Sequence, residues 1–339
     1  MQKKSSFFSS IFFPSLLFGL VSALAFSLQI FALSKKANLT TVVLGTDWLA
    51  QAEHGGFYQA VADGTYQKYG LDVQIKMGGP QVNGVQMLLA NEIQFFMPPA
   101  TVVLLAADKK LPLLSVAAIF QKDLGVLMAH PNAGNDSFEK LKGKPIFISP
   151  TTAAAIWGFL SAKYGYTDDQ KIGYSHSLIP FLKDKSAIQE GIITSEPYVV
   201  EKEGHFKPVV LALSDAGLNS YGEILTCTKK YEQENSVIVK KFVQASIEGW
   251  KHYLKDPSLG NKLIQKDNPQ MPDDLLTYAW KELKAQKIIE GRDAEKYGIG
   301  AMTDKGWSDF YNDMLKVNSL PKNIDVKSIY TLKYLIKGL

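Results

Sequence analysis

The chain has 339 residues, and 46% of them are hydrophobic, which is enough apolar material for a folded core rather than a disordered chain. The formal net charge is +4, but four lysines within the first 36 residues account for the whole excess, and the remaining 33 basic and 33 acidic residues balance. Nucleic-acid binding requires a concentrated basic face, so this composition excludes a nucleic-acid partner.

The first 36 residues differ in composition from the rest. Lys3 and Lys4 precede residues 5–34, a run of 30 residues without a charged side chain, which is typical of an export signal. Residues 23–25, Ala-Leu-Ala, offer a cleavage site of the small-x-small kind. Because about 20 apolar residues suffice to cross a bilayer, an uncleaved inner-membrane anchor is the alternative. We therefore predict that residues 1–36 are a signal peptide or anchor and that the protein is periplasmic.

Strands and helices alternate after residue 40, at a spacing typical of βαβ units around mostly parallel sheets. The first set has predicted strands at 41–44, 71–76, 93–97, 113–119 and 124–129, and predicted helices at 56–69, 84–91 and 101–109. The second set has predicted strands at 145–149, 171–176, 191–194 and 207–211, and predicted helices at 153–164, 184–190 and 198–203. After about residue 228 the predicted segments are helices, at 237–254, 260–265, 273–284 and 305–317.

Two turn-rich breaks, at 130–136 and 214–221, divide these sets into two lobes. We predict a first lobe in 37–130, a second lobe in 131–218, and a return to the first lobe with carboxy-terminal helices in 219–339. Apolar residues at helical spacing in 237–254, including Trp250, are expected to face a core. Cys227 is the single cysteine, in a predicted buried strand, so no internal disulfide and no cysteine-based metal cluster can form. We predict no metal and no cofactor.

Three polar or aromatic side chains follow the first predicted strand: Asp47, Trp48 and His54. Ligands of open α/β sheets sit beyond the carboxyl ends of strands, so these side chains are expected to face a cleft. An aromatic face beside a carboxylate suits a flat heterocycle with donors and acceptors on its edge. The alternatives are a turn or helix cap for Asp47, packing between lobes for Trp48, and a helix start for His54.

Several segments resemble one family, the periplasmic binding proteins for the thiamine pyrimidine precursor, which includes the fungal thiamine-pyrimidine synthases. They are residues 45–58, 118–123, 138–143, 194–198, 242–250 and 298–304, and the resemblance covers nearly everything after residue 40. It implies a bilobed α/β periplasmic-binding-protein fold of type II, with two crossovers that allow hinge closure. It also implies a solute-binding component of an ABC importer, a monomer that works with permease and ATPase subunits.

Within this resemblance Asp47 and Trp48 bind the ring, and Glu196, in the turn 194–198, recognises its edge. Tyr198 repeats the pairing of an acid with an aromatic side chain. The simpler interpretation is that Thr194 or Ser195 caps a helix whose first turn contains Pro197. The implied ligand is a hydroxymethyl- or formylaminomethyl-aminopyrimidine.

Further candidates follow other predicted strands. Thr151 and Thr152 stand at a helix start where related proteins bind anions, but Arg292 is the only arginine, which favours a neutral heterocycle over a sulfonate. Trp157, in the same helix, lines the cleft or packs in the core. The Gln121 amide can both donate to and accept from an aminopyrimidine edge.

No catalytic motif is present, and the histidines lack metal-ligand spacing, so we predict a protein that is not an enzyme. The resembling synthases consume an active-site histidine and have a cysteine-rich iron motif, whereas this chain has one cysteine and an export signal. His54 is therefore expected to form a hydrogen-bonding wall or a helix start. The alternatives are a binding protein for a sulfonate, a nitrate-like anion or a flavin, or a pyrimidine-precursor synthase.

Overall fold

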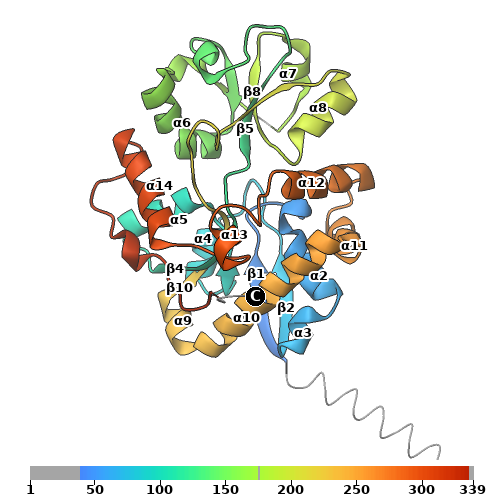
Figure 1. The fold of residues 1–339 in the computed structure, drawn as a ribbon, viewed down its shortest axis with the longest axis vertical. Coiled ribbons are helices and arrows are strands. Elements are labelled where there is room, and N and C mark those ends of the chain that lie inside the picture. Colours follow the sequence, from blue (N-terminus) through green and yellow to red (C-terminus); the bar gives the residue numbers. More distant parts are fainter. Residues whose placement is uncertain (1–38, 175, 336–339) are drawn as a thin grey trace, which may run out of the picture. The chain divides into compact units, whose positions relative to one another are not determined.

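A computed structural model describes residues 39–174 and 176–335. The predicted signal or anchor, residues 1–36 with its cleavage site, lies outside the described residues. The described residues from Thr41 onward form one compact unit with two five-stranded sheets, one in each lobe (Figure 1). In the part of the chain that the structure describes, none of the helices has both the length and the apolar character needed to cross a membrane.

The first sheet has the strand order β2-β1-β3-β10-β4. Strand β1 is parallel to β3, and β10 is antiparallel to both β3 and β4. The bounds are β1 Thr40–Gly45, β2 Leu71–Lys76, β3 Phe95–Phe96, β4 Leu113–Phe120 and β10 Gly222–Thr228. Cys227 is fully buried in β10, as its apolar surroundings in the sequence predict.

Helices from before and after the second lobe in the sequence complete the first lobe. They are α2 Gly55–Ala62, α3 Thr65–Lys68, α4 Gly84–Leu89, α5 Ala100–Asp108, α9 Lys229–Glu234, α10 Ser236–Lys255, α11 Ser258–Asp267, α12 Asp273–Ala285, α13 Asp293–Tyr297 and α14 Asp304–Lys316. The 3-10 turns η1 Ala52–His54 and η4 Val326–Ser328 complete this lobe. The predicted helix 56–69 is interrupted at Gly64, whose φ of 77° lies in the left-handed region that favours glycine.

The second sheet has the order β7-β6-β8-β5-β9, in which β6 is parallel to β7 and β8, and β5 is antiparallel to β8 and β9. Its elements are β5 Gly125–Ala129, η2 Phe138–Leu141, β6 Ile146–Ile148, α6 Pro150–Tyr164, η3 Asp168–Gln170, β7 Lys171–Gly173, α7 Ile179–Lys183, β8 Ile188–Ile192, α8 Glu196–Gly204 and β9 Val209–Ala212. The predicted helix at 184–190 is wrong, because that stretch contains a turn and most of buried strand β8.

The first passage between the lobes differs from the predicted one. Strand β5 pairs in the second sheet, so the chain crosses in residues 121–124, and the turn-rich segment 130–136 lies within the second lobe. The sequence analysis placed the passage at 130–136 because turn-forming residues cluster there, but such a cluster also occurs within a lobe, and here it follows β5 of the second sheet. The chain returns in residues 213–221, the region that the sequence analysis proposed.

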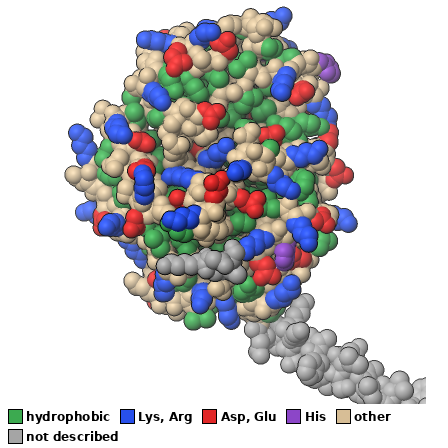
Figure 2. All heavy atoms as spheres, in the orientation of Figure 1, with side chains coloured by type: hydrophobic (Ala, Val, Ile, Leu, Met, Phe, Trp, Pro, Cys, Tyr) green, Lys and Arg blue, Asp and Glu red, His purple; other side chains and the backbone are tan. Residues whose placement is uncertain are grey.

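In the first lobe, α10 packs against α2. Val239, Phe242, Val243, Ile247 and Trp250 are all buried, which confirms the predicted apolar face of α10. The two helices approach closely because both carry glycine: a Cβ on Gly249 would lie 2.4 Å from the carbonyl oxygen of Gly56. On the visible face of the molecule, acidic and basic side chains are interspersed, in keeping with the balanced charge (Figure 2).

We predict that Gly249→Ala destabilises the protein. The new methyl group would overlap backbone atoms of α2, so the helices must separate, at a cost of about 1–3 kcal/mol that exceeds the gain in helix propensity. Thermal unfolding followed by circular dichroism should show a lower melting temperature. Gly173→Ala is the matched control, because its Cβ would have no atom within 4 Å. Equal melting temperatures for the two variants would contradict this account of helix packing.

Candidate functional site

The strand directions bring polar side chains to one edge of each sheet. Strands β1, β3 and β4 run in the same direction, and β10 runs against them, so the residues after β1 lie at the same edge as the start of β10. Asp47 and Trp48 follow β1, and Glu223 stands at the start of β10. In the second lobe, β6, β7 and β8 are likewise parallel, so the residues that follow them share one edge.

Side chains from these two edges contact each other. The Thr194 hydroxyl, after β8, donates a hydrogen bond to the buried carboxylate of Glu53 in η1. The centroid of the Trp48 ring lies 5.1 Å from the centroid of the His176 ring, and His176 belongs to the loop after β7. We define the interlobe site by nine residues: Asp47, Trp48, Glu53, His54 and Glu223 of the first lobe, and His176, Glu190, Thr194 and Glu196 of the second.

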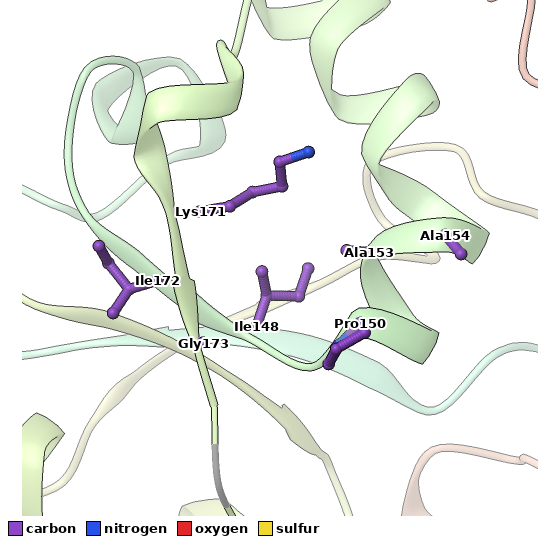
Figure 3. Close-up of a pocket in the computed structure, with 7 residues that line it drawn as sticks. All are labelled: Ile148, Pro150, Ala153, Ala154, Lys171, Ile172 and Gly173. Carbon is purple, nitrogen blue, oxygen red and sulfur yellow. The ribbon is translucent and has the colours of Figure 1, made fainter.

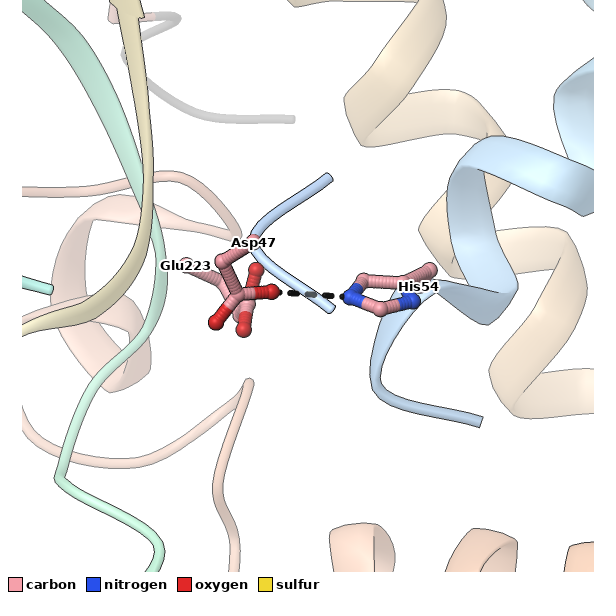
Figure 4. Close-up of side chains that lie close together, drawn as sticks. All are labelled: Asp47, His54 and Glu223. Atoms are coloured by element: carbon pink, nitrogen blue, oxygen red, sulfur yellow. Dashed lines mark hydrogen bonds and ion pairs between the residues drawn. The ribbon is translucent and has the colours of Figure 1, made fainter. Parts of the chain in front are cut away.

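Asp47, His54 and Glu223 form the centre of the first-lobe half (Figure 4). The Asp47 Oδ1 and His54 Nε2 atoms are 3.0 Å apart, and His54 is fully buried whereas Asp47 is partly exposed. The Glu223 carboxylate lies beside that of Asp47. Glu223 has a φ of 44°, and a left-handed backbone at a residue other than glycine is costly and frequent at functional sites.

Burial raises the pKa values of the buried carboxyl groups of the interlobe site. Burial raises the pKa of Glu223 well above its ordinary value, and the negative charges of Asp47 and Glu53 raise it further. Burial also raises the pKa of Glu53, against the hydrogen bond from Thr194. Burial likewise raises the pKa of Glu190, and Ser149 and Thr152, which lie against its carboxyl group, oppose the rise.

Glu196 begins α8, and its Oε2 accepts a hydrogen bond of 2.7 Å from the backbone N–H of Ile192. Burial is the main reason that its pKa rises to about 7. Pro197 lies in the first turn of α8, as predicted. Ser195 occupies the cap position, but its side chain makes no capping hydrogen bond, and Thr194 binds Glu53 instead. The simple capping interpretation of this turn is therefore wrong for both hydroxyls.

Tyr198 lies apart from the acidic centre. Its hydroxyl donates to Asp274 Oδ2 of α12 at 2.7 Å, and Lys202 Nζ approaches the same oxygen at 2.5 Å. Nearby, the hydroxyl of Tyr278 donates to the carbonyl of Ile193 at 3.1 Å. These contacts join α8 of the second lobe to α12 of the first. The structure thus places Tyr198 in a bridge between the lobes.

Gln121 and Trp157 are also placed apart from the acidic centre. Gln121 is buried in the first crossover, and its Nε2 donates to the carbonyls of Ala118 and Ala301, both at 2.9 Å. Trp157 is buried in the core of the second lobe, with its ring 5.9 Å from that of Tyr166. For Trp157 this is the core-packing alternative of the sequence analysis, whereas Gln121 was expected to meet the edge of a ligand.

Thr151 and Thr152 lie at the start of α6, beside a cavity of about 410 Å³ in the second lobe (Figure 3). The cavity is mostly apolar and is lined by Ile148, Pro150, Ala153, Ala154, Lys171, Ile172 and Gly173. Thr151 is exposed, and the N–H of Thr152 donates to Ser149 Oγ, which caps the helix. The carboxyl group of Glu190 also lies against Ser149 and Thr152, so an acidic side chain of the protein occupies the place at this helix start where an anionic ligand would bind.

One signal in the sequence could have found Glu223. It is the only charged residue in the predicted buried strand 223–228, and a charge at the end of such a strand favours a functional role. Glu53 and Glu190 were equally missed, although both are buried acids, with exposed fractions of 4% and 8%.

The donors of Asp47, His54 and Glu223 lie within 4.8 Å of one another, and carboxylate and imidazole are ligands of divalent metals. A histidine that binds a metal almost always hydrogen-bonds through its other ring nitrogen. The Nδ1 atom of His54 is buried and has no partner among the described residues. The described structure therefore lacks the outer contact that would orient His54 toward a metal, and the set fits a ligand with N–H donors better.

Comparisons with known proteins agree with this fold. Residues 51–259 match the family model described as NMT1/THI5 like. The riboflavin-binding protein RibY of Chloroflexus aurantiacus is 23% identical, over 89% of this chain and 88% of that protein. The formylaminopyrimidine-binding protein of Halalkalibacterium halodurans is 25% identical, over 69% of this chain and 73% of that protein.

Among solved structures, the periplasmic aliphatic sulphonate-binding protein SsuA of Escherichia coli has a TM-score of 0.65 at 12% identity. The match covers 85% of this chain and 91% of that one. At this identity the likeness concerns the fold, and it confirms the predicted bilobed α/β architecture of periplasmic binding proteins.

We predict that stability falls as pH rises, because Glu196 has a raised pKa. A carboxyl whose folded-state pKa is raised binds its proton more tightly in the folded state, so its stabilising contribution is present at pH 4.5 and is lost as pH rises through about 7. Each such proton changes the free energy of unfolding by at most about 1.4 kcal/mol per pH unit. Denaturant unfolding between pH 5 and pH 8 measures this slope.

Glu196→Gln should reduce the slope, since the amide does not titrate while its oxygen can still accept from Ile192. Glu234→Gln, on exposed α9, is the control and should leave the slope unchanged. An equal slope in Glu196→Gln and wild type would show that Glu196 has an ordinary pKa.

Proposed function

The chain belongs to the NMT1/THI5-like family, and on that premise we propose that it is the solute-binding component of an ABC importer. It captures a small planar heterocycle, best a thiamine pyrimidine precursor such as a hydroxymethyl- or formylaminomethyl-aminopyrimidine. The relative that is named for formylaminopyrimidine supports this choice of ligand.

The observation that carries the proposal is the position of Trp48 beside Asp47 and Glu223 at one sheet edge. An indole ring offers a stacking face for a pyrimidine, and ionised carboxylates accept hydrogen bonds from its amino groups. Thr194 and His176 of the second lobe contact this half directly, so a ligand there touches both lobes. A ligand that contacts both lobes favours the closed arrangement of the lobes over the open one.

A sulfonate or nitrate-like anion fits this site poorly. None of the nine residues of the interlobe site is lysine or arginine, and five of them are acids. An anion would meet these carboxylates without a basic partner, at a cost in electrostatic repulsion. The single cysteine and the binding functions of the named relatives favour a binding protein over a pyrimidine synthase.

Riboflavin is the second candidate ligand, because RibY matches the chain over 89% of its length. The isoalloxazine ring is also flat and would stack on Trp48. We propose, further, that residues 1–36 export the protein to the periplasm, and that it acts there as a monomer with a permease and an ATPase subunit.

Isothermal titration calorimetry distinguishes these ligands. The hydroxymethyl- and formylaminomethyl-aminopyrimidines should bind more tightly than riboflavin, and an alkanesulfonate should not bind. Tighter binding of riboflavin would replace the pyrimidine by a flavin as the ligand. Tight binding of the sulfonate would contradict the site assignment itself.

We predict that Trp48→Ala weakens pyrimidine binding about ten- to a hundredfold, because stacking of a base on an aromatic ring contributes about 1–3 kcal/mol. Trp48→Phe keeps an aromatic face and should lose much less affinity. Both variants should keep the melting temperature within about 2 °C of wild type, since Trp48 lies outside the main cores. If Trp48→Ala binds as tightly as wild type, the pyrimidine does not stack on this ring.

A further inference from the structure

The acids of the interlobe site lack basic partners. Asp47 pairs with His54, Glu53 accepts from Thr194, and Glu196 accepts from a backbone N–H. Among the described residues, no lysine or arginine forms a salt bridge with any of the five acids. The site therefore gathers five carboxyl groups between the lobes without a basic partner.

Among the described residues, two buried carboxyl oxygens, one from each lobe, have no hydrogen-bond partner: Oε2 of Glu190, whose carboxyl group lies against Ser149 and Thr152, and Oε2 of Glu223. Glu190 is only 8% exposed. A buried acceptor without a donor costs about 1–3 kcal/mol, and more when it is charged. Unpaired acceptors in both lobes indicate a ligand that supplies donors to each of them.

The groups that face these two carboxylates are themselves mostly acidic. Besides burial, the charges of Asp47, in the loop after β1, and of Glu53, in η1, raise the pKa of Glu223. Besides burial, the charges of Glu53 and Glu190 raise the pKa of Glu196, at the start of α8. His176, in the loop after β7, lowers the pKa of Glu190. Tyr174 has its pKa raised by burial and by the charges of Glu196 and Glu190.

We propose that the site binds its aminopyrimidine as a cation, protonated on a ring nitrogen, with N–H groups donating to Glu190 and Glu223. The inference rests on the proposed function and deepens it, because it specifies the charge of the bound heterocycle. The ring nitrogen takes up one proton, from solvent or from a site carboxyl, and no other bond is made or broken.

The chemistry of the ring explains why this form is selected. Protonation turns the ring nitrogen from an acceptor into a donor beside the exocyclic amine, giving two parallel N–H groups that match a carboxylate as a guanidinium does. Hydrogen bonds between ionised partners are about twice as strong as neutral ones. A neutral ring, whose nitrogen only accepts, would require the facing carboxyl group to keep the proton and donate it, which gives up the charged pair.

The test compares two nearly isosteric ligands. One is a 4-aminopyrimidine with hydrogen at the ring carbon between the two nitrogens, and the other has fluorine there, which makes the ring nitrogens much less basic. Full-length protein is treated with a chelator, and calorimetry is carried out at pH 7. The hydrogen compound should bind at least about tenfold more tightly, and its ultraviolet difference spectrum on binding should match that produced by acidifying the free ligand.

Glu190→Gln and Glu223→Gln should each reduce this preference, because an amide gains nothing from a cation, while Glu234→Gln on exposed α9 should keep it. If the ring binds neutral, the fluorinated compound binds equally well or better, since fluorine makes the exocyclic amine a stronger donor, and the difference spectrum shows no protonation. That result overturns the inference and leaves the proposed function intact.

If neither pyrimidine binds, the result contradicts both the proposed function and the inference that the ring binds as a cation. If binding returns only when Zn²⁺ is added to the chelator-treated protein, the acids of the site hold a metal, and the cationic ring is likewise overturned.

Discussion

The arrangement of the site depends on the burial of Glu53 between the lobes, where its carboxylate accepts from Thr194. Breaking a buried charged hydrogen bond leaves a desolvated carboxylate, so the contact holds the 3-10 turn η1 of the first lobe against the start of α8. The same turn carries His54, which fixes Asp47. One contact between the lobes thus helps to position the side chains of the interlobe site.

Other contacts between the lobes and within the first crossover surround the hydrogen bond between Thr194 and Glu53. The bridge from Tyr198 and Lys202 to Asp274 is exposed, and exposed ion pairs contribute little to stability, at most about 1 kcal/mol. In the short first crossover, the side chain of Gln121 donates hydrogen bonds to the backbone carbonyls of Ala118 and Ala301. The interface therefore combines one buried polar contact with weaker peripheral ones, which suits lobes that must separate to release a ligand.

The sequence predicted the local half of the site and missed most of the part that depends on distant pairing. Asp47 and His54 are seven residues apart in one loop after a strand, so a pattern of strand and turn is enough to place them together. Glu223 joins them only because β10 runs antiparallel beside β3, and no local pattern specifies that pairing. Tyr198 was assigned to the ligand from its resemblance to the pair Asp47 and Trp48, whereas the partner that decides its role, Asp274, lies 76 residues away. The fold class followed from alternation of strands and helices, but the first crossover did not, because hydrophobicity does not tell which sheet a strand joins.

The burial of Cys227 has a practical consequence. Burial raises the pKa of its thiol to about 12, so at neutral pH almost none of it is the reactive thiolate. Because it is also the only cysteine in the chain, a second cysteine introduced on the surface would be the single position open to maleimide chemistry. A fluorophore attached on α8 or α12, at the rim between the lobes, would report on their separation without removal of a native residue. The chain is thus already suited to conversion into an optical sensor for its own solute.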